Sequence, residues 1–155
     1  MTSIFLDANI FLDVFSRRDP FYPHSARVLT LIERQHLTGY TSSLNFSNLF
    51  YIIRKQRSRD AALTYLRQLA SFIKILAVDE QIITNALHST FTDFEDAIQY
   101  YTAQSQNIRF LLTHNTQDYT TVDKKILQVV TAEDYLKLWK ASSTLSVSGQ
   151  IQKKP

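Results

Sequence analysis

Short apolar runs that alternate with segments of helical periodicity along most of the chain place the tightest limit on its fold. We expect the runs to be β-strands, at residues 3–7, 37–41, 73–78, 108–113 and 128–131. Strands separated by helices cannot form hairpins, so they pair in parallel while the crossover helices cover both faces. The sequence therefore predicts an α/β fold, a three-layer α/β/α sandwich with a parallel sheet of four or five strands.

Helical spacing of apolar residues predicts the segments that connect and follow these strands. The expected helices lie at residues 10–15, 24–34, 44–57, 59–72, 79–88, 94–106 and 132–140. From residue 141 onward the chain is rich in serine and ends in Lys-Lys-Pro. We therefore expect one domain over residues 1–140 and a flexible C-terminal tail over residues 141–155.

Composition excludes several classes of chemistry. The chain of 155 residues has no cysteine, which excludes disulfides, zinc–thiolate sites and thiol nucleophiles. It has only 2 glycines, too few for the glycine-rich loops that cradle nucleotide phosphates. No apolar run approaches the length of about eighteen residues that a membrane span requires, and no secretory leader is visible. We expect a cytoplasmic protein without a membrane partner.

Charge is unevenly distributed along the chain. Residues 34–78 carry seven Lys or Arg and one Asp, a formal charge of +6, whereas the remainder carries −3. A basic segment beside an acidic remainder suggests a polyanionic partner, although a solvated basic helix face would look the same. Charge alone leaves both interpretations open.

Carboxylates recur where predicted strands end and where one helix begins. Asp7 ends the first strand, and Asp118 follows the fourth strand by five residues, where an Asx turn is also possible. Asp93, Glu95 and Asp96 lie at the start of the helix that precedes that strand. Ligands of parallel sheets bind beyond the carboxyl ends of the strands. Carboxylates gathered there without a cation would repel one another, so the pattern predicts a site for a hard divalent ion such as Mg²⁺ or Mn²⁺.

Local helix capping is the competing explanation for most of these acids. Asp7 and Asp93 each stand where an N-cap is expected. Thr92 and Glu95 have the spacing of a capping box, which would give both a structural role. Asp96 falls just after that box and is not required by it.

Three motifs in this order resemble those of PIN-domain nucleases. Residues 6–13, LDANIFLD, resemble the family's opening DxNxxLD pattern. Residues 93–99, DFEDAIQ, are similar to its central DxEDA helix. Residues 112–119, LTHNTQDY, resemble its TRNxxDF turn, with His114 in place of arginine and Tyr119 in place of phenylalanine. The resemblance spans about residues 3–138.

The resemblance implies a function as well as a fold. It implies a divalent-metal-dependent endoribonuclease that hydrolyses phosphodiester bonds of single-stranded or structured RNA and leaves a 3′-hydroxyl and a 5′-phosphate. Many similar proteins are toxins of the VapC type, which implies an antitoxin partner. Related domains often pair, which makes a homodimer a further expectation.

Carried over position by position, the resemblance implies roles for particular residues. Asp7, Asp96 and Asp118 would be the catalytic metal ligands, and Asn115 competes with Asp118 for the third position. Thr113 could bond a ligating carboxylate or a phosphate, or simply end its strand. The parts of Asp93 and Glu95 as supporting residues stay open.

One position departs from the family pattern. Asn48 stands where the family usually has a glutamate early in its third helix. An amide oxygen can ligate a hard cation, but it brings no charge and cannot act as a base. The alternative function is therefore a degenerate PIN domain that binds RNA or a partner protein without cleavage.

A basic strip closes the same helix and the turn after it. Its members are Arg54, Lys55, Arg57 and Arg59. They are the expected contacts to RNA phosphates, and an acidic antitoxin would be attracted to the same strip.

Overall fold

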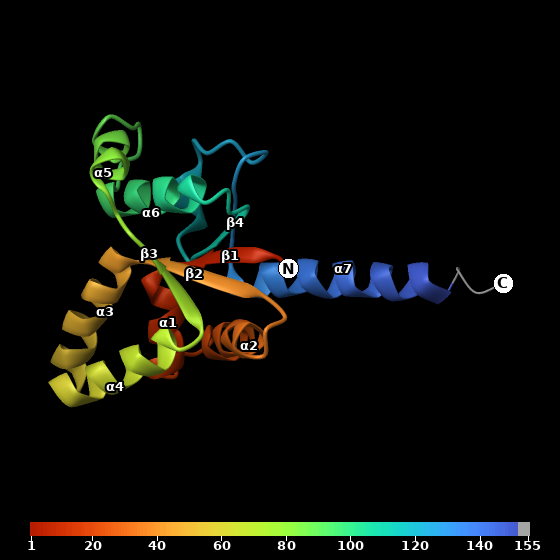
Figure 1. Ribbon diagram of the computed structural model, residues 1–155, viewed down its shortest axis with the longest axis horizontal. Coiled ribbons are helices and arrows are strands. Elements are labelled where there is room, and N and C mark those ends of the chain that lie inside the picture. Colours follow the sequence, from red (N-terminus) through yellow and green to blue (C-terminus); the bar gives the residue numbers. More distant parts are fainter. Residues whose placement is uncertain (152–155) are drawn as a thin grey trace.

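The five strands form one fully parallel sheet in the order β3-β2-β1-β4-β5. The computed structural model describes residues 1–151, with side chains through residue 143 (Figure 1). The strands are β1 (Ser3–Leu6), β2 (Thr38–Ser42), β3 (Ile73–Leu76), β4 (Phe110–Leu112) and β5 (Gln128–Val130). The predicted α/β class and the parallel pairing are confirmed, with five strands.

Helices cover both faces of this sheet and make it a three-layer sandwich. They are α1 (Ala8–Phe15), α2 (Tyr22–Glu33), α3 (Ser43–Gln56), α4 (Arg59–Ala70), α5 (Glu80–Leu87), α6 (Phe94–Ser105) and α7 (Ala132–Ile151), with a 3₁₀ turn η1 (Thr116–Tyr119). In Figure 1 α5 and α6 lie above the sheet, and α1 to α4 lie below it. No helix in the part of the chain described here has the length and hydropathy needed to cross a bilayer.

The central strand β1 divides the core between the two helical layers. Ile4 and Leu6 are fully buried in the cluster formed with α1 to α4, whereas Phe5 is fully buried in the cluster on the α6 side. Alternate residues of a strand point to opposite faces, so one apolar run supplies both cores. This double burial fixes the register of β1 and therefore the position of the residue that follows it.

The carboxyl ends of β1 and β4 are aligned by backbone hydrogen bonds. Asp7 N–H donates to the carbonyl of Leu112, and Thr113 N–H donates to the carbonyl of Val130. The residues that follow β1 and β4 consequently lie side by side at one edge of the sheet. Ser42, at the end of β2, caps α3 by accepting a hydrogen bond from Asn45 N–H.

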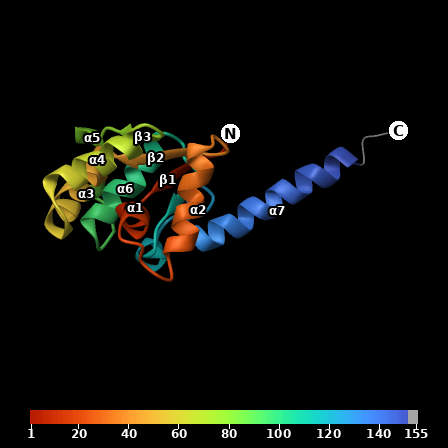
Figure 2. The ribbon, with the colours of Figure 1, turned by 90° about the horizontal axis from the view of Figure 1, so that it is seen from below.

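The last helix extends further than the sequence pattern predicts. The apolar period predicts an end near Lys140, but the backbone of α7 continues to Ile151, and the helix projects away from the sheet (Figure 2). Its first turns pack their apolar side chains, including Tyr135 and Leu136, into the core beside α2. The serine-rich composition gives no sign of this continuation. The flexibility of residues 141–155 stays a prediction, with residues 152–155 outside the described chain.

Candidate active site

A pocket of about 450 Å³ opens at the carboxyl edge of the sheet, among α1, α3, α6 and η1. Five carboxylates and five amides line it: Asp7, Asp93, Glu95, Asp96 and Asp118, with Asn9, Asn45, Asn48, Gln99 and Asn115. The fold thus brings together acids from three distant segments, as the sheet topology requires.

Asp7 stands at the junction of β1 and α1, 7% exposed. Its side chain makes no capping hydrogen bond to α1, so the local capping explanation for this acid is wrong. Instead its Oδ2 accepts hydrogen bonds from Thr113 Oγ1 at 2.8 Å and from Asn9 Nδ2 at 3.4 Å. Thr113 therefore orients the Asp7 carboxylate from the neighbouring strand end.

Asp96 lies in the first turn of α6 and is 8% exposed. Its Oδ1 accepts a hydrogen bond from the Tyr119 hydroxyl at 3.1 Å. The capping box predicted for Thr92 and Glu95 is wrong, because the residue that caps α6 is Asp93, whose Oδ1 accepts from Asp96 N–H at 3.0 Å. This cap fixes the first turn of α6, from which the Asp96 side chain lines the pocket.

Burial raises the pKa of Asp96 from 3.8 to about 6, and the nearby charge of Asp93 contributes to the rise. The hydrogen bond from Tyr119 opposes this shift, while the charges of Asp7 and Asp118 add to it. None of the ion pairs among the described residues involves Asp7, Asp96 or Asp118. The carboxylates therefore repel one another without a compensating side-chain cation.

A buried amide network forms the floor of the pocket. Asn45 is 5% exposed, and its Nδ2 donates to Gln99 Oε1 and Thr41 Oγ1, each at 3.1 Å. This network ties α3 to α6 beneath the acids. Sequence reasoning missed Asn45 and Gln99, although each sits three residues from a predicted site residue, Asn48 or Asp96, on the same helix face.

The remaining predicted site residues occupy the rim. Asn48 is partly buried on α3, one turn beyond Asn45, while Asp93, Glu95 and Asn115 are exposed. Asp118 is also exposed, at the turn η1, and its side chain makes no hydrogen bond with another described residue. Rim side chains of this kind can change rotamer at little cost, unlike the two buried acids.

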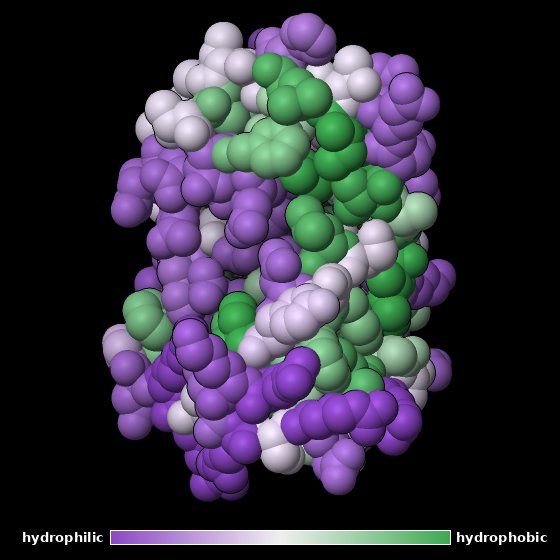
Figure 3. Space-filling view, turned by 90° about the vertical axis from the view of Figure 1, so that its left-hand side faces the viewer, coloured by the Kyte–Doolittle hydropathy of each residue, from purple (hydrophilic) through white to green (hydrophobic). Residues whose placement is uncertain are grey.

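The basic strip lies outside the pocket, at the end of α3 and the start of α4. Arg54, Lys55, Arg57 and Arg59 are all exposed. Arg57 lies over the ring of Phe15, and Arg59 pairs with Asp60 at 3.6 Å. Figure 3 shows that the lower end of this face, where α3 meets α4, is hydrophilic.

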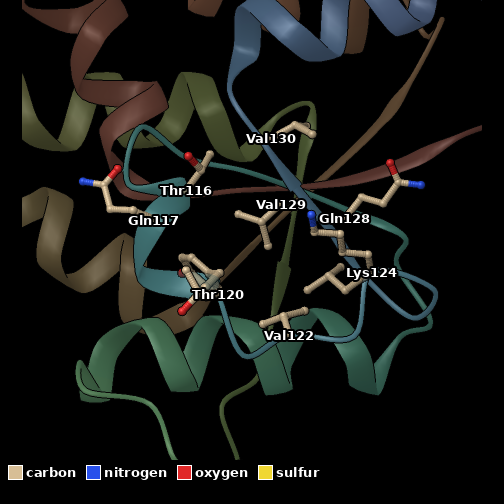
Figure 4. Close-up of a pocket in the computed structure, with 10 residues that line it drawn as sticks. Thr116, Gln117, Thr120, Val122, Lys124, Gln128, Val129 and Val130 are labelled. Atoms are coloured by element: carbon tan, nitrogen blue, oxygen red, sulfur yellow. The ribbon is translucent and has the colours of Figure 1, made fainter.

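A larger cavity of about 570 Å³ lies on the other side of η1, next to β5. Figure 4 shows Val122, Val129 and Val130 among the side chains that line it, together with Thr116 and Gln128. Its one charged lining side chain is Lys124. Size alone therefore does not identify the site, since the convergent carboxylates line the smaller pocket.

The chemistry of the pocket fits a hard divalent cation bound by few protein ligands. In the described part of the chain no three His, Asp or Glu side chains are arranged so that they could hold a metal ion. Mg²⁺ and Mn²⁺ nevertheless bind commonly through one or two carboxylates together with water and substrate phosphate. Asp7 Oδ1 and Asp96 Oδ2 are the carboxylate oxygens that the hydrogen bonds from Thr113 and Tyr119 leave available.

Fold and pocket together define an α/β/α protein with an acidic site at the carboxyl edge of a parallel sheet. A family model described as a PIN domain matches residues 3–117, and the chain belongs to this family. The match includes β1 and α6, which position the buried acids Asp7 and Asp96, and β4, which is followed by Thr113.

One curated protein and several solved structures match most of the chain. The protein is 21% identical over 141 residues to ribonuclease VapC1 of Aquifex aeolicus, covering 88% of this chain and 94% of that protein. Its fold resembles a toxin–antitoxin complex from Klebsiella pneumoniae, with a TM-score of 0.62, 23% identity and coverage of 83% and 97% of the two chains. It also resembles VapBC-1 from nontypeable Haemophilus influenzae, with a TM-score of 0.62, 18% identity and coverage of 85% and 99%. These structures share its fold.

Proposed function

We propose that this protein is a divalent-metal-dependent endoribonuclease of the VapC toxin type. The observation that carries the proposal is the convergence of two buried carboxylates, Asp7 and Asp96, in one pocket. No basic side chain within the described part of the chain pairs with either of them. Two such charges cost free energy unless a cation joins them. The similarity to a ribonuclease from Aquifex aeolicus supports RNA as the substrate.

Asp7 and Asp96 would hold the Mg²⁺ or Mn²⁺ ion, with Asp118 or Asn115 completing the site from the rim. The bound ion would lower the pKa of a water molecule and stabilise charge on the phosphodiester. Thr113 keeps Asp7 in place and Tyr119 keeps Asp96 in place through their hydroxyl groups. Asp93 acts by capping α6, and Glu95 adds negative charge at the rim.

The basic strip and the related complexes suggest the partners. Arg54 and Lys55 lie in the last turn of α3, and Lys55 follows Asn48, which lines the pocket, by two turns on the same helix face. RNA phosphates held by the strip would pass close to the acids. Because similar folds occur in toxin–antitoxin complexes, we propose a protein antitoxin, a homodimeric state and action in the cytoplasm.

Cleavage of labelled single-stranded RNA and tRNA with Mn²⁺ tests the nuclease function directly. We expect cleavage by the wild-type protein, dependent on the metal and lost in Asp7→Asn and Asp96→Asn. The matched control is Asp134→Asn, which removes an exposed acid from α7 far from the pocket and should leave cleavage intact. Cleavage that survives both pocket substitutions would point to a contaminating nuclease.

The second candidate function is binding of RNA or a partner protein without cleavage. The observation in its favour is Asn48, which lines the pocket and supplies no charge. Calorimetric titration with Mn²⁺ separates the two candidates, because the nuclease requires an affinity that Asp96→Asn weakens. Absence of binding at millimolar Mn²⁺ would favour the non-catalytic function.

A further inference from the structure

A fully buried carboxylate outside the acidic pocket connects three elements of the fold. Asp13, on α1, is 0% exposed, and its Oδ2 accepts a hydrogen bond from Ser25 Oγ on α2 at 2.8 Å. The same Oδ2 lies 2.6 Å from His114 Nε2, in the turn that follows β4. Asp13 Oδ1 has no hydrogen-bond partner among the described residues, so these two contacts are what stabilises the buried group.

His114 is held from two sides. A carboxylate oxygen only accepts hydrogen bonds when ionised, so Nε2 of His114 is the donor to Asp13. The imidazole also stacks on Phe21, with ring centroids 3.9 Å apart and planes inclined by 21°. Its side chain is 17% exposed. Both contacts restrict this ring, and they restrict the backbone of the turn that carries it.

That turn leads directly into the acidic pocket. Thr113, the residue before His114, donates to Asp7 Oδ2, and Asn115, the residue after it, donates its N–H to Thr113 Oγ1 at 3.2 Å. Asp118 N–H in turn donates to the carbonyl of Asn115 at 3.1 Å. The side chains of Asn115 and Asp118 are exposed and make no hydrogen bond with other described residues, so their positions follow from the backbone of the turn.

We propose that His114 is a positioning residue that fastens the turn at residues 113–118 to Asp13 of α1, and thereby holds Asn115 and Asp118 opposite Asp7 and Asp96. The part that concerns metal and RNA rests on the proposed nuclease function. Ser25 bonds the same oxygen of Asp13 but belongs to α2, whereas His114 is itself a residue of the turn. Removal of the His114 hydrogen bond should loosen the turn, whereas removal of the Ser25 hydrogen bond should not.

Three variants separate positioning from general stability. His114→Phe keeps a ring over Phe21 but removes the donor, and His114→Gln retains a donor at the place of Nε2. Ser25→Ala is the matched control, since it removes the other hydrogen bond to Asp13 Oδ2. Should His114→Phe be insoluble because the Asp13 charge is left unpaired, Asp13→Asn combined with His114→Phe takes its place without a buried charge.

Amide hydrogen exchange of the metal-free protein, followed by mass spectrometry, is the first measurement. For residues 114–119 we expect exchange about tenfold faster in His114→Phe, close to wild type in His114→Gln, and unchanged in Ser25→Ala. Equal acceleration in His114→Phe and Ser25→Ala, or no acceleration in either, would overturn the proposal. If only the bulk of the His114 side chain or its stacking on Phe21 mattered, His114→Gln would not restore the exchange rate of the wild-type protein.

Mn²⁺ affinity and RNA cleavage are the second readout. We expect about tenfold weaker Mn²⁺ binding and a matching loss of kcat, with a smaller change in KM, in His114→Phe only. If the wild-type protein neither binds Mn²⁺ nor cleaves RNA while the exchange result holds, the nuclease function fails and the positioning of the turn stands. If the wild-type protein cleaves RNA and the exchange pattern is absent, the positioning role fails alone.

Discussion

Asn48 is the position on α3 at which a carboxylate would add negative charge to the acidic pocket. It lines the pocket on the side opposite α6, where an acid would face Asp7 and Asp96. We predict that Asn48→Glu strengthens Mn²⁺ binding about tenfold, because a further carboxylate increases attraction for a divalent ion. Calorimetric titration measures this change.

The control for that prediction is Asn48→Gln, which adds the same length without the charge. It should leave the Mn²⁺ affinity near that of the wild-type protein. Equal Mn²⁺ affinities for the wild-type protein, Asn48→Glu and Asn48→Gln would mean that a side chain at position 48 does not reach the ion. The difference from the family pattern at Asn48 would then not affect metal binding.

Asp96 makes the stability of the metal-free protein depend on pH. Its folded-state pKa is raised to about 6, mainly by burial, so the folded protein holds this proton more tightly than the unfolded chain. The stabilising contribution is full below about pH 4 and is lost as pH rises through about 6. We predict that, between about pH 4 and above pH 6, the unfolding free energy of the wild-type protein falls by about 1 to 2 kcal/mol relative to that of Asp96→Asn. This figure allows for screening of the charge by solvent.

Urea unfolding of both proteins in the presence of a chelator, at intervals from about pH 4 to about pH 7, measures the difference. The difference between wild type and Asp96→Asn isolates this group, because other titrating groups are common to both. A difference that stays flat with pH would contradict the raised pKa of Asp96. Added Mn²⁺ should restore the wild-type protein most at the higher pH, where Asp96 is ionised.

Single residues also show which members of the pocket can be located from the sequence. Asp7 and Asp96 could be placed because each stands at the boundary of a strongly patterned element. Asn45 and Tyr119 could not, because their roles depend on contacts across the fold, to Gln99 and to Asp96 respectively. Pairwise contacts of this kind leave no periodic signal in a single sequence.

At the scale of elements, Gly39 shows how closely α2 packs on the sheet. A Cβ at this position of β2 would lie 2.6 Å from Ile32 Cδ1 and 2.9 Å from Ile73 Cδ1. We predict that Gly39→Ala destabilises the protein by about 1 to 2 kcal/mol, because the two isoleucines must shift within a tightly packed layer. Urea unfolding measures the loss.

Removal of the clashing methyl group provides the control. Ile32→Val lacks Cδ1 and alone should cost about 0.5 to 1.5 kcal/mol. Combined with Gly39→Ala it should cost less than the sum of the two single changes, because the new methyl group then fills the vacated space. Strict additivity would show that the layer adapts elsewhere and that close packing does not explain Gly39.

Elements with a strong apolar period are predicted well from the sequence, and those fixed by tertiary contacts are not. Strands β1 and β4 follow from buried apolar runs between helices, whereas their position as neighbours in the sheet does not. The sequence indicates a turn near Asp118 but not the 3₁₀ form of η1, because this element is short and is held by Tyr119 packing into the core on the α6 side. Helix α6 begins where expected, but its cap is Asp93 alone, since a capping-box spacing indicates the start of a helix without determining which side chain bonds to it.

The whole molecule separates its charges between the acidic pocket and the basic strip. The pocket gathers five carboxylates, while residues 34–78 hold a formal charge of +6. Helix α3 lines the pocket through Asn45 and Asn48 and ends in the basic strip, so a single RNA strand could meet the strip and the pocket together. The strip would attract phosphates over a distance of about one Debye length, and a metal ion at the pocket would remove the repulsion that phosphates otherwise meet there.

The salt dependence of RNA binding tests this separation. The test uses an Asp96→Asn background, in which we expect no cleavage. There we predict that Arg54→Ala with Lys55→Ala reduces the slope of log affinity against log salt by about 1.4, or about 0.7 for each phosphate that the protein no longer neutralises. The control pair is Lys124→Ala with Lys125→Ala, which removes the same charge from exposed residues beyond η1. Fluorescence anisotropy of a labelled single strand between low and physiological salt gives both slopes. Equal slopes for the two pairs would mean that net charge alone governs binding, whereas a change confined to Arg54 and Lys55 would place the RNA along the end of α3.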